Sequence, residues 1–329
     1  MELVCPAGNL PSLKTAIDHG ADTVYIGFSD DTNARHFAGL NFNHQRAKQG
    51  VEYAHSHHRK VYLAINTYPQ PSGWKRWTDA VDRAVDIGVD AIILADTGLL
   101  EYAHHYYPET NLHLSVQASA TSYETLNYYQ KHFKIKRAVL PRVLSVAQIK
   151  KVIENTQVEI EVFGFGSLCV MVEGRCILSS YATGRSPNTY GACSPASHVE
   201  YIDNSIELET RLGGVLIDSY TKDETAGYPT LCKGRFETMG NTYYALEEPT
   251  SLNTLDILPQ LDEIGVKAIK IEGRQRSPAY ITTVAKTWSE AIKQLKTGKY
   301  HTQPQWNQAL SKVSEGLQTT LGAYSRKWQ

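Results

Sequence analysis

The chain has 329 residues, 42% of them hydrophobic, which is enough for one large barrel or two smaller domains. Its 33 basic and 34 acidic side chains nearly cancel, which argues against a protein that binds nucleic acid through strong net positive charge. The N-terminal sequence MELVCPAGNL lacks the features of a signal peptide, and no stretch approaches the ~20 apolar residues of a membrane span. We therefore expect a cytoplasmic protein.

Short apolar segments alternate with longer helical patterns through the first half of the chain. The predicted strands are Glu2–Pro6, Thr23–Phe28, Lys60–Asn66, Ala91–Ala95, Leu112–Gln117, Arg137–Pro141 and Val158–Phe163. The predicted helices between them are Leu10–His19, His44–His57, Trp74–Asp86, Gly98–Tyr106, Tyr123–His132 and Ser145–Glu154. After an irregular segment, the pattern resumes with a helix over Asn253–Ile264, a strand over Ala268–Ile271 and a helix over Pro278–Leu295.

Eight strand signals with intervening helices favour an α/β fold, a (β/α)8 TIM-like barrel. An open doubly wound sheet is the alternative, because periodicity does not show closure. No G-x-G-x-x-G fingerprint follows the first strand, where the sequence is CPAGN. We predict a single TIM-like barrel domain over 1–329, with a cysteine-bearing insertion at 164–252 between strands seven and eight and a C-terminal extension at 299–329.

Four of the five cysteines lie within the predicted insertion, at Cys169, Cys176, Cys193 and Cys232. Four thiolates from loops are the donor set of an iron–sulfur cluster or a structural zinc. No pair has C-x2-C spacing, so wide spacing suits a cluster held by several loops, although spacing alone does not exclude zinc. Four independent buried cysteines are a further alternative. In a reducing compartment, metal ligation is favoured over disulfides.

Charged side chains follow the last barrel strands, at the end of a parallel barrel where active sites form. Arg142, Glu272 and Arg274 are our candidates for binding an acidic small molecule, since guanidinium forks suit carboxylates. For each arginine taken alone, a salt bridge at the rim with a residue such as Glu272 is the more favoured interpretation. The segment Asp30–Phe42, which carries Asn33, Arg35 and His36, is either a mobile substrate loop or an ordinary connection.

Hydrolytic motifs are missing from the sequence, which has neither G-x-S-x-G nor H-E-x-x-H. The histidines of the sequence HSHHR, His55, His57 and His58, fall at the end of a predicted helix. We interpret them as a solvated helix C-terminus rather than a metal site.

The stretch EVFGFGSLCVMVEGRCILS, from Glu161 to Ser179, resembles the signature of the collagenase-like U-type peptidase family. Further segments, among them CPAGNL, DDTNARHFAGLNF, SPNTYGACSPA, GYPTLCKGR and KIEGRQRSPAY, are similar to the branch of that family that serves ubiquinone biosynthesis. The resemblance covers essentially the whole chain.

The resemblance implies a [4Fe–4S] cluster bound by Cys169, Cys176, Cys193 and Cys232. It also implies a heterodimer with a related UbiV-like iron–sulfur protein, a UbiT-like lipid carrier, and oxygen-independent hydroxylation of a ubiquinone precursor with prephenate as oxygen donor. Two alternatives stay open. One is a scaffold subunit whose partner houses the chemistry, and the other is RNA-base hydroxylation, which the neutral charge makes the less favoured.

Overall fold

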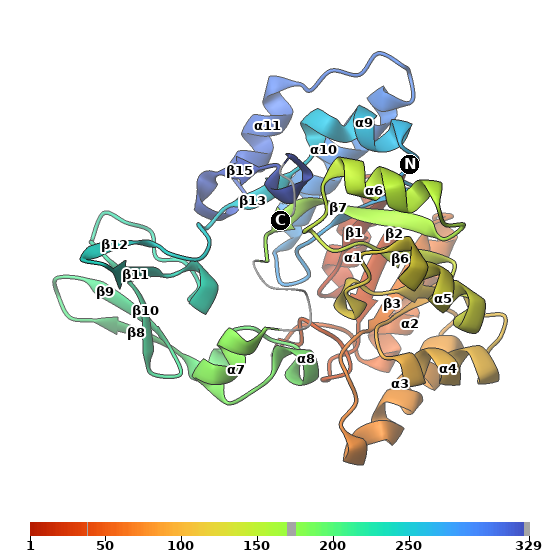
Figure 1. The fold of residues 1–329 in the computed structure, drawn as a ribbon, viewed down its shortest axis with the longest axis horizontal. Helices are drawn as coiled ribbons and strands as arrows, with labels where there is room; N and C mark the ends of the chain where they lie inside the picture. Colours follow the sequence, from red (N-terminus) through yellow and green to blue (C-terminus); the bar gives the residue numbers. More distant parts are fainter. Residues whose placement is uncertain (38, 170–175, 326–329) are drawn as a thin grey trace.

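Eight parallel strands close into a barrel in the computed structural model, which describes residues 1–37, 39–169 and 176–325 (Figure 1). The last barrel strand, β14, pairs in parallel with both β1 and β7, and this double pairing closes the sheet. The predicted (β/α)8 barrel is therefore confirmed, and the open doubly wound sheet is excluded. The strands are β1 Glu2–Pro6, β2 Thr23–Gly27, β3 Lys60–Ile65, β4 Ala91–Leu94, β5 Leu112–Leu114, β6 Arg137–Val139, β7 Glu159–Ser167 and β14 Ala268–Ile271.

Helices surround the barrel, and polar residues that follow the strands fix where most of them begin. Asn9 accepts a hydrogen bond from the Ser12 N–H, and Asp96 accepts one from the Leu99 N–H, so both side chains are helix N-caps. Ser145 forms a capping box with Gln148. The helices are α1 Leu10–Asp18, α2 His44–Ser56, α3 Trp74–Asp86, α4 Thr97–Tyr106, α5 Tyr123–Phe133, α6 Val146–Glu154, α9 Leu258–Glu263 and α10 Pro278–Leu295.

The predicted helix over Asn253–Ile264 is wrong in its first half. A short strand, β13 Ser251–Asn253, pairs antiparallel with the end of β7, and the Thr254 N–H donates to the Gly164 carbonyl. A 3-10 turn precedes α9, which begins only at Leu258. Pro259 in the first turn of α9 suits a helix start, because proline has no N–H to contribute to a preceding turn.

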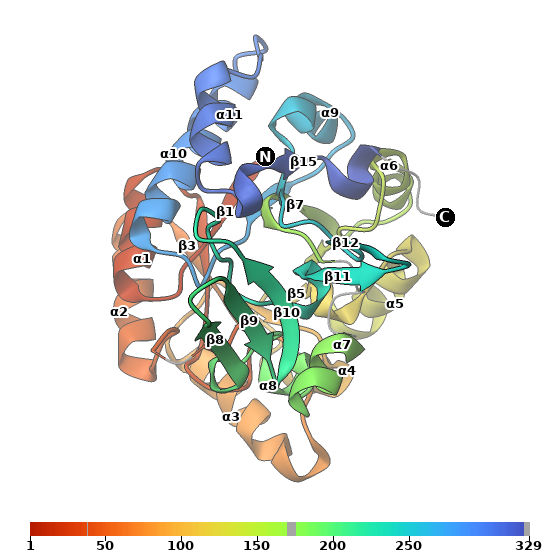
Figure 2. The same cartoon turned by 90° about the vertical axis from the view of Figure 1, so that its left-hand side faces the viewer.

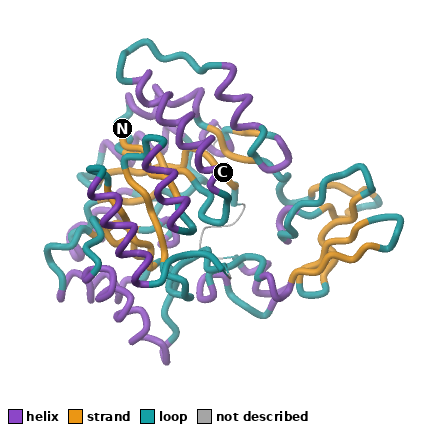
Figure 3. The backbone as a smooth tube through the Cα atoms, turned by 180° about the vertical axis from the view of Figure 1, so that it is seen from behind, coloured by secondary structure: helices purple, strands orange, loops and turns teal. Residues whose placement is uncertain are grey.

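The insertion between β7 and β13 projects from the barrel as an arm of short elements (Figures 1 and 3). Because β7 ends at the C-terminal face, the arm begins there, and Figure 2 shows its strands in front of the barrel. The arm contains α7 Ile177–Thr183, α8 Pro187–Tyr190, the antiparallel strands β8 Val199–Asp203, β9 Leu208–Leu212 and β10 Val215–Tyr220, and the hairpin of β11 Arg235–Thr238 with β12 Asn241–Tyr244.

The C-terminal segment returns to the same face of the barrel. It contains α11 Pro304–Ser311 and β15 Thr319–Thr320, and β15 pairs in parallel with β13. The Tyr324 hydroxyl then donates to the Phe163 carbonyl of β7 at 2.8 Å. None of the helices that the structure describes combines the length and apolar character needed to cross a membrane.

Charged side chains fill the end of the barrel interior opposite the arm. Buried Arg137 of β6 binds Glu2 at 2.8 Å and Glu159 at 2.7 Å, while buried Lys270 of β14 binds Glu161 at 2.7 Å. The larger apolar core lies outside the barrel, between the strands and the surrounding helices. Buried charges survive because each is paired inside the barrel.

Candidate functional site

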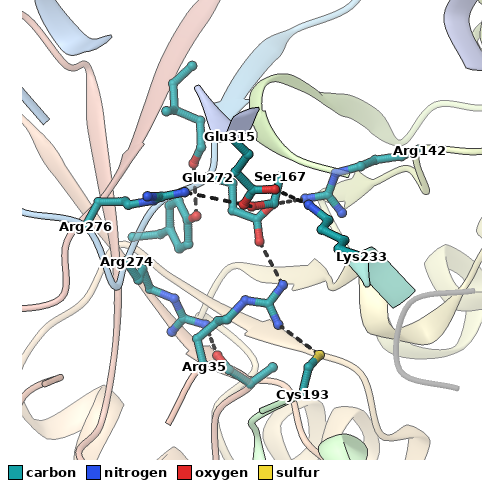
Figure 4. Close-up of polar contacts among 12 residues, drawn as sticks. Arg35, Arg142, Ser167, Cys193, Lys233, Glu272, Arg274, Arg276 and Glu315 are labelled. Carbon is teal, nitrogen blue, oxygen red and sulfur yellow. Dashed lines mark hydrogen bonds and ion pairs between the residues drawn. The ribbon is translucent and has the colours of Figure 1, made fainter. Parts of the chain in front are cut away.

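A buried carboxylate, Glu272, is held between two arginines where β14 ends (Figure 4). Arg142, which follows β6, donates to Glu272 Oε2, and Arg35, in the loop after β2, donates to Glu272 Oε1 at 2.8 Å. The guanidinium of Arg142 also lies over the Phe163 ring, 3.5 Å from its centroid. Three loops that are far apart in sequence therefore meet at this carboxylate.

The charge of Glu272 is set by its two partners. Burial raises its pKa, but the positive charges of Arg142 and Arg35 lower it more strongly, to about 2. Glu272 is thus an anion at any physiological pH and keeps both arginines oriented.

Arg274 lies next to this pair and has different partners. It donates to the Asn33 Oδ1 at 2.9 Å and to the Ala34 carbonyl, both of them neutral oxygens, and it lies over Tyr25. Burial lowers the pKa of Arg274 to about 10, with a further contribution from the nearby charge of Arg35. Arg35, Arg142 and Arg274 together carry more positive charge than Glu272 neutralises, so positive charge is in excess around this carboxylate.

The loop after β2 contacts the arm directly. The Arg35 N–H donates to the Gly191 carbonyl at 2.5 Å, and Arg35 Nη1 lies 4.0 Å from Cys193 Sγ. Gly191 has φ +78°, and a Cβ at this position would lie 2.5 Å from the Asn33 carbonyl oxygen. Glycine is needed here because it permits both the positive φ and the close approach of the two loops.

A second ionic cluster centres on Glu315 of the C-terminal segment (Figure 4). Its carboxylate binds Lys233, accepts from the Ser167 hydroxyl and lies 3.3 Å from Arg276 Nη2. Lys233 directly follows Cys232, and Ser167 lies two residues before Cys169. Glu315 therefore ties together two of the cysteine loops and the loop after β14.

All four cysteines of the predicted site lie outside any disulfide and are partly buried. Cys169 follows β7, Cys176 precedes α7, Cys193 follows α8, and Cys232 lies in a 3-10 turn over Leu231–Lys233. Burial raises the pKa of Cys232 to about 12, and the charges of the other three cysteines raise it further while Lys233 lowers it. The three other sulfurs thus lie near enough to Cys232 to act on its charge.

The donor set fits an iron–sulfur cluster in its chemistry. As thiolates, the four cysteines would repel one another, and a bound metal together with Lys233 beside Cys232 and Arg35 beside Cys193 would relieve that repulsion. Within the described residues, no three His, Cys, Asp or Glu side chains form a group that could hold a metal ion. A four-iron cluster takes each thiolate on a different iron atom, so its ligands lie farther apart than the four ligands of one zinc.

The structure brings together the other predicted site residues Arg142, Glu272 and Arg274. Cys5, the fifth cysteine, is buried in β1 instead. The helix-end histidines behave as predicted, since the His57 N–H caps α2 and His55 lies exposed, 3.0 Å from Asp90. Segment 170–175 of the signature, between Cys169 and Cys176, lies outside the described residues.

Two participants were not singled out from the sequence. The sequence places Arg35 in a loop without assigning it a role. The feature that points to it is the group of polar residues after a barrel strand. The sequence around Glu315 contains no motif that predicts a role for it, and its partner Lys233 lies 82 residues away.

Comparison with known proteins gives the relatives of the chain. The model of Peptidase family U32 matches residues 8–327. An uncharacterized protease of Methanocaldococcus jannaschii is 34% identical over 92% of this chain and 67% of its own length. The tRNA hydroxylation protein P of Escherichia coli is 31% identical over 91% of this chain and 69% of its own length. The 23S rRNA 5-hydroxycytidine C2501 synthase of Escherichia coli is 29% identical over 89% of this chain but only 39% of its own length.

Proposed function

The chain belongs to peptidase family U32, and from this membership and the charges at its barrel mouth we propose that it is a UbiU-like subunit for oxygen-independent hydroxylation of ubiquinone precursors. The observation that carries the proposal is the contact of Arg35, which pairs with Glu272 at the barrel mouth, with Cys193, one of the four cysteines of the predicted site. Relatives named for hydroxylation of tRNA and rRNA support the reaction class.

The cofactor in this proposal is a [4Fe–4S] cluster held by Cys169, Cys176, Cys193 and Cys232. Such a cluster supplies one-electron redox chemistry when bound. Arg35 and Lys233 lie beside two of the thiols and would offset part of the negative charge of the thiolates. Zinc in the same place is the alternative, and metal analysis separates the two.

The arginines around Glu272 support binding of an acidic small molecule, for which prephenate is our candidate as oxygen donor. Arg274 donates to neutral oxygens in the contacts above, so a carboxylate of the ligand would be a stronger acceptor than its present partners. Arg142 is fixed by Glu272 and by the Phe163 ring, which makes it a preorganised donor. These side chains would bind and orient the anion, and their burial would limit the access of water.

The projecting arm supports the need for a partner, which we propose to be a UbiV-like iron–sulfur protein in a heterodimer, with a UbiT-like lipid carrier presenting the ubiquinone precursor. Most of the exposed large apolar side chains of the described residues lie on the arm, including Ile177, Tyr181, Ile206 and Met239. Exposed apolar groups of this kind mark interaction surfaces. In the scaffold alternative, the chemistry would reside in that partner.

Hydroxylation of an RNA base is the second candidate function, and the names of the Escherichia coli relatives favour it. The arm argues against it, because residues 164–252 carry eleven acidic and six basic side chains. A net negative charge on the arm is unfavourable for binding the phosphate backbone of RNA.

The proposal is tested in cells that lack their own anaerobic hydroxylation genes and are grown without oxygen. Expression of this chain with a UbiV-like partner should restore ubiquinone, and Cys193→Ala should abolish the restoration. Hydroxylated bases in tRNA are measured in the same cultures. Restored tRNA hydroxylation without ubiquinone would replace the proposal with the second candidate.

A further inference from the structure

The guanidinium of Arg35 connects the two halves of the site (Figure 4). Its Nη1 lies 4.0 Å from Cys193 Sγ, and its Nη2 donates to Glu272 Oε1 at 2.8 Å. Arginine is planar and holds its donors in a fixed fork, so one side chain can serve a sulfur and a carboxylate at once. A change of charge at Cys193 therefore acts through Arg35 on the ion pair between Arg142 and Glu272.

The backbone of Arg35 is held in an unfavourable conformation. Its φ is +82°, a region that costs a residue with a side chain about 1–2 kcal/mol. Hydrogen bonds on both sides fix this conformation, one from the Arg35 N–H to the Gly191 carbonyl at 2.5 Å and one from Asn41 Nδ2 to the Arg35 carbonyl at 3.0 Å. Strain maintained by its surroundings is typical of functional positions.

Among the described residues, Lys233, Arg276 and Arg274 have oxygen partners of their own near the cysteines. Lys233, next to Cys232, is paired with Glu315, and Arg276 lies 3.3 Å from the same carboxylate. Arg274 donates toward the loop at Asn33 and Ala34. Arg35 is also paired, with Glu272, but its second nitrogen lies 4.0 Å from Cys193 Sγ, so it brings positive charge to the thiol side of the site.

We propose that Arg35 is a positioning residue that links the four-cysteine site to the Arg142–Glu272 pair and favours the reduced, more negative form of a cluster bound there. The inference rests on the proposed function for the presence of that cluster. An added electron is stabilised by a nearby fixed cation, so Arg35 should raise the midpoint reduction potential.

The test is a redox titration of anaerobically prepared protein, followed by electron paramagnetic resonance, with iron measured per chain. Arg35→Gln should keep its iron but show a lower midpoint potential. Arg35→Lys keeps the charge without the fork and should fall between that variant and the wild type. Glu272→Gln removes a neighbouring negative charge and should raise the potential. Arg76→Gln is the matched control. Arg76 lies exposed in α3 and pairs at 2.7 Å with Asp31, which belongs to the same loop as Arg35.

Each outcome decides the inference. A wild-type potential in Arg35→Gln, with the cluster present, would overturn the role of Arg35 and leave the proposed function intact. A wild-type protein without iron would overturn both. If Arg35→Gln loses iron while Arg35→Lys retains it, the positioning role is supported. Iron loss from both variants, together with an unchanged potential in Glu272→Gln, would overturn it.

Discussion

Lys233 of the arm and Glu315 of the C-terminal segment form an ion pair beside the cysteines, and Glu315 also binds Ser167 and Arg276. Both members are largely buried, with side-chain exposures of 13% and 21%. A segment that follows the last barrel helix therefore fastens the arm to the barrel at the place where Cys232 enters the site.

Loss of this contact should loosen the site without unfolding the barrel. Glu315→Gln removes the charge that holds Lys233, and we expect a cost of about 1–3 kcal/mol in the free energy of unfolding. We also expect the anaerobically prepared protein to release iron to a chelator several-fold faster. Glu263→Gln is the control, because Glu263 is exposed at the end of α9. Equal iron release from the wild type and Glu315→Gln would contradict this role.

The contact between the arm and the loop after β2 should depend on Gly191. Gly191→Ala adds a Cβ that would lie 2.5 Å from the Asn33 carbonyl, so the loops must separate. We expect a loss of about 2–4 kcal/mol, from the clash together with the strain of the positive φ. Gly184→Ala is matched to it, since Gly184 has φ +67° and nothing within 4 Å. Chemical unfolding should show the smaller loss, about 1–2 kcal/mol, for Gly184→Ala; equal losses would show that the contact is unimportant.

The pairing of Glu2 with Arg137 predicts a pH dependence of stability. Burial raises the pKa of Glu2, but Arg137 outweighs it and lowers the pKa from 4.5 to about 2. A lowered carboxyl pKa stabilises the fold fully above the unfolded value of about 4.5, and this contribution is lost as the pH falls toward 2.

Glu2→Gln should therefore destabilise the protein by about 2 kcal/mol at pH 7 and by roughly half as much at pH 3, where part of the contribution remains. Urea unfolding at both pH values measures the difference. Glu52→Gln, at an exposed position of α2, should have little effect at either pH. A cost for Glu2→Gln that stays constant between pH 7 and pH 3 would disprove the assignment.

Arg274 should control the affinity for an acidic ligand. Arg274→Gln removes a buried charge from the barrel mouth, and we expect at least a tenfold weaker binding of prephenate, consistent with loss of a charge-assisted hydrogen bond. Isothermal titration calorimetry measures the affinity, and a thermal melt reports on the loop that Arg274 contacts at Asn33 and Ala34. Arg46→Gln, at an exposed position of α2, is the control. Unchanged binding in a folded Arg274→Gln protein would remove Arg274 from the binding site.

Much of the barrel could be predicted from the sequence, because its strands and helices carry local signals. β1, α3, β14 and α10 begin and end at the predicted residues. The helix predicted over Asn253–Ile264 failed because Ser251–Asn253 pairs with β7, which lies more than eighty residues earlier. Pairing across such a distance leaves no periodic signal in a single short segment.

Some residues of the site can also be predicted from local features of the sequence, and others cannot. Arg142, Glu272 and Arg274 follow barrel strands, so the topology alone places them at one end. Arg35 has a positive φ and lies 4.0 Å from Cys193 Sγ, which is 158 residues away in the sequence. Glu315 comes from the C-terminal segment. Neither feature is encoded near the cysteines, so reasoning from motifs does not find them.

The central claim is that Cys169, Cys176, Cys193 and Cys232 together hold an iron–sulfur cluster. Iron, sulfide and zinc measured per chain after anaerobic purification test it most directly. We predict about four iron and four sulfide per chain with little zinc, and loss of most of both in each Cys→Ala variant. Stoichiometric zinc without sulfide, or a folded chain free of metal, would contradict the account.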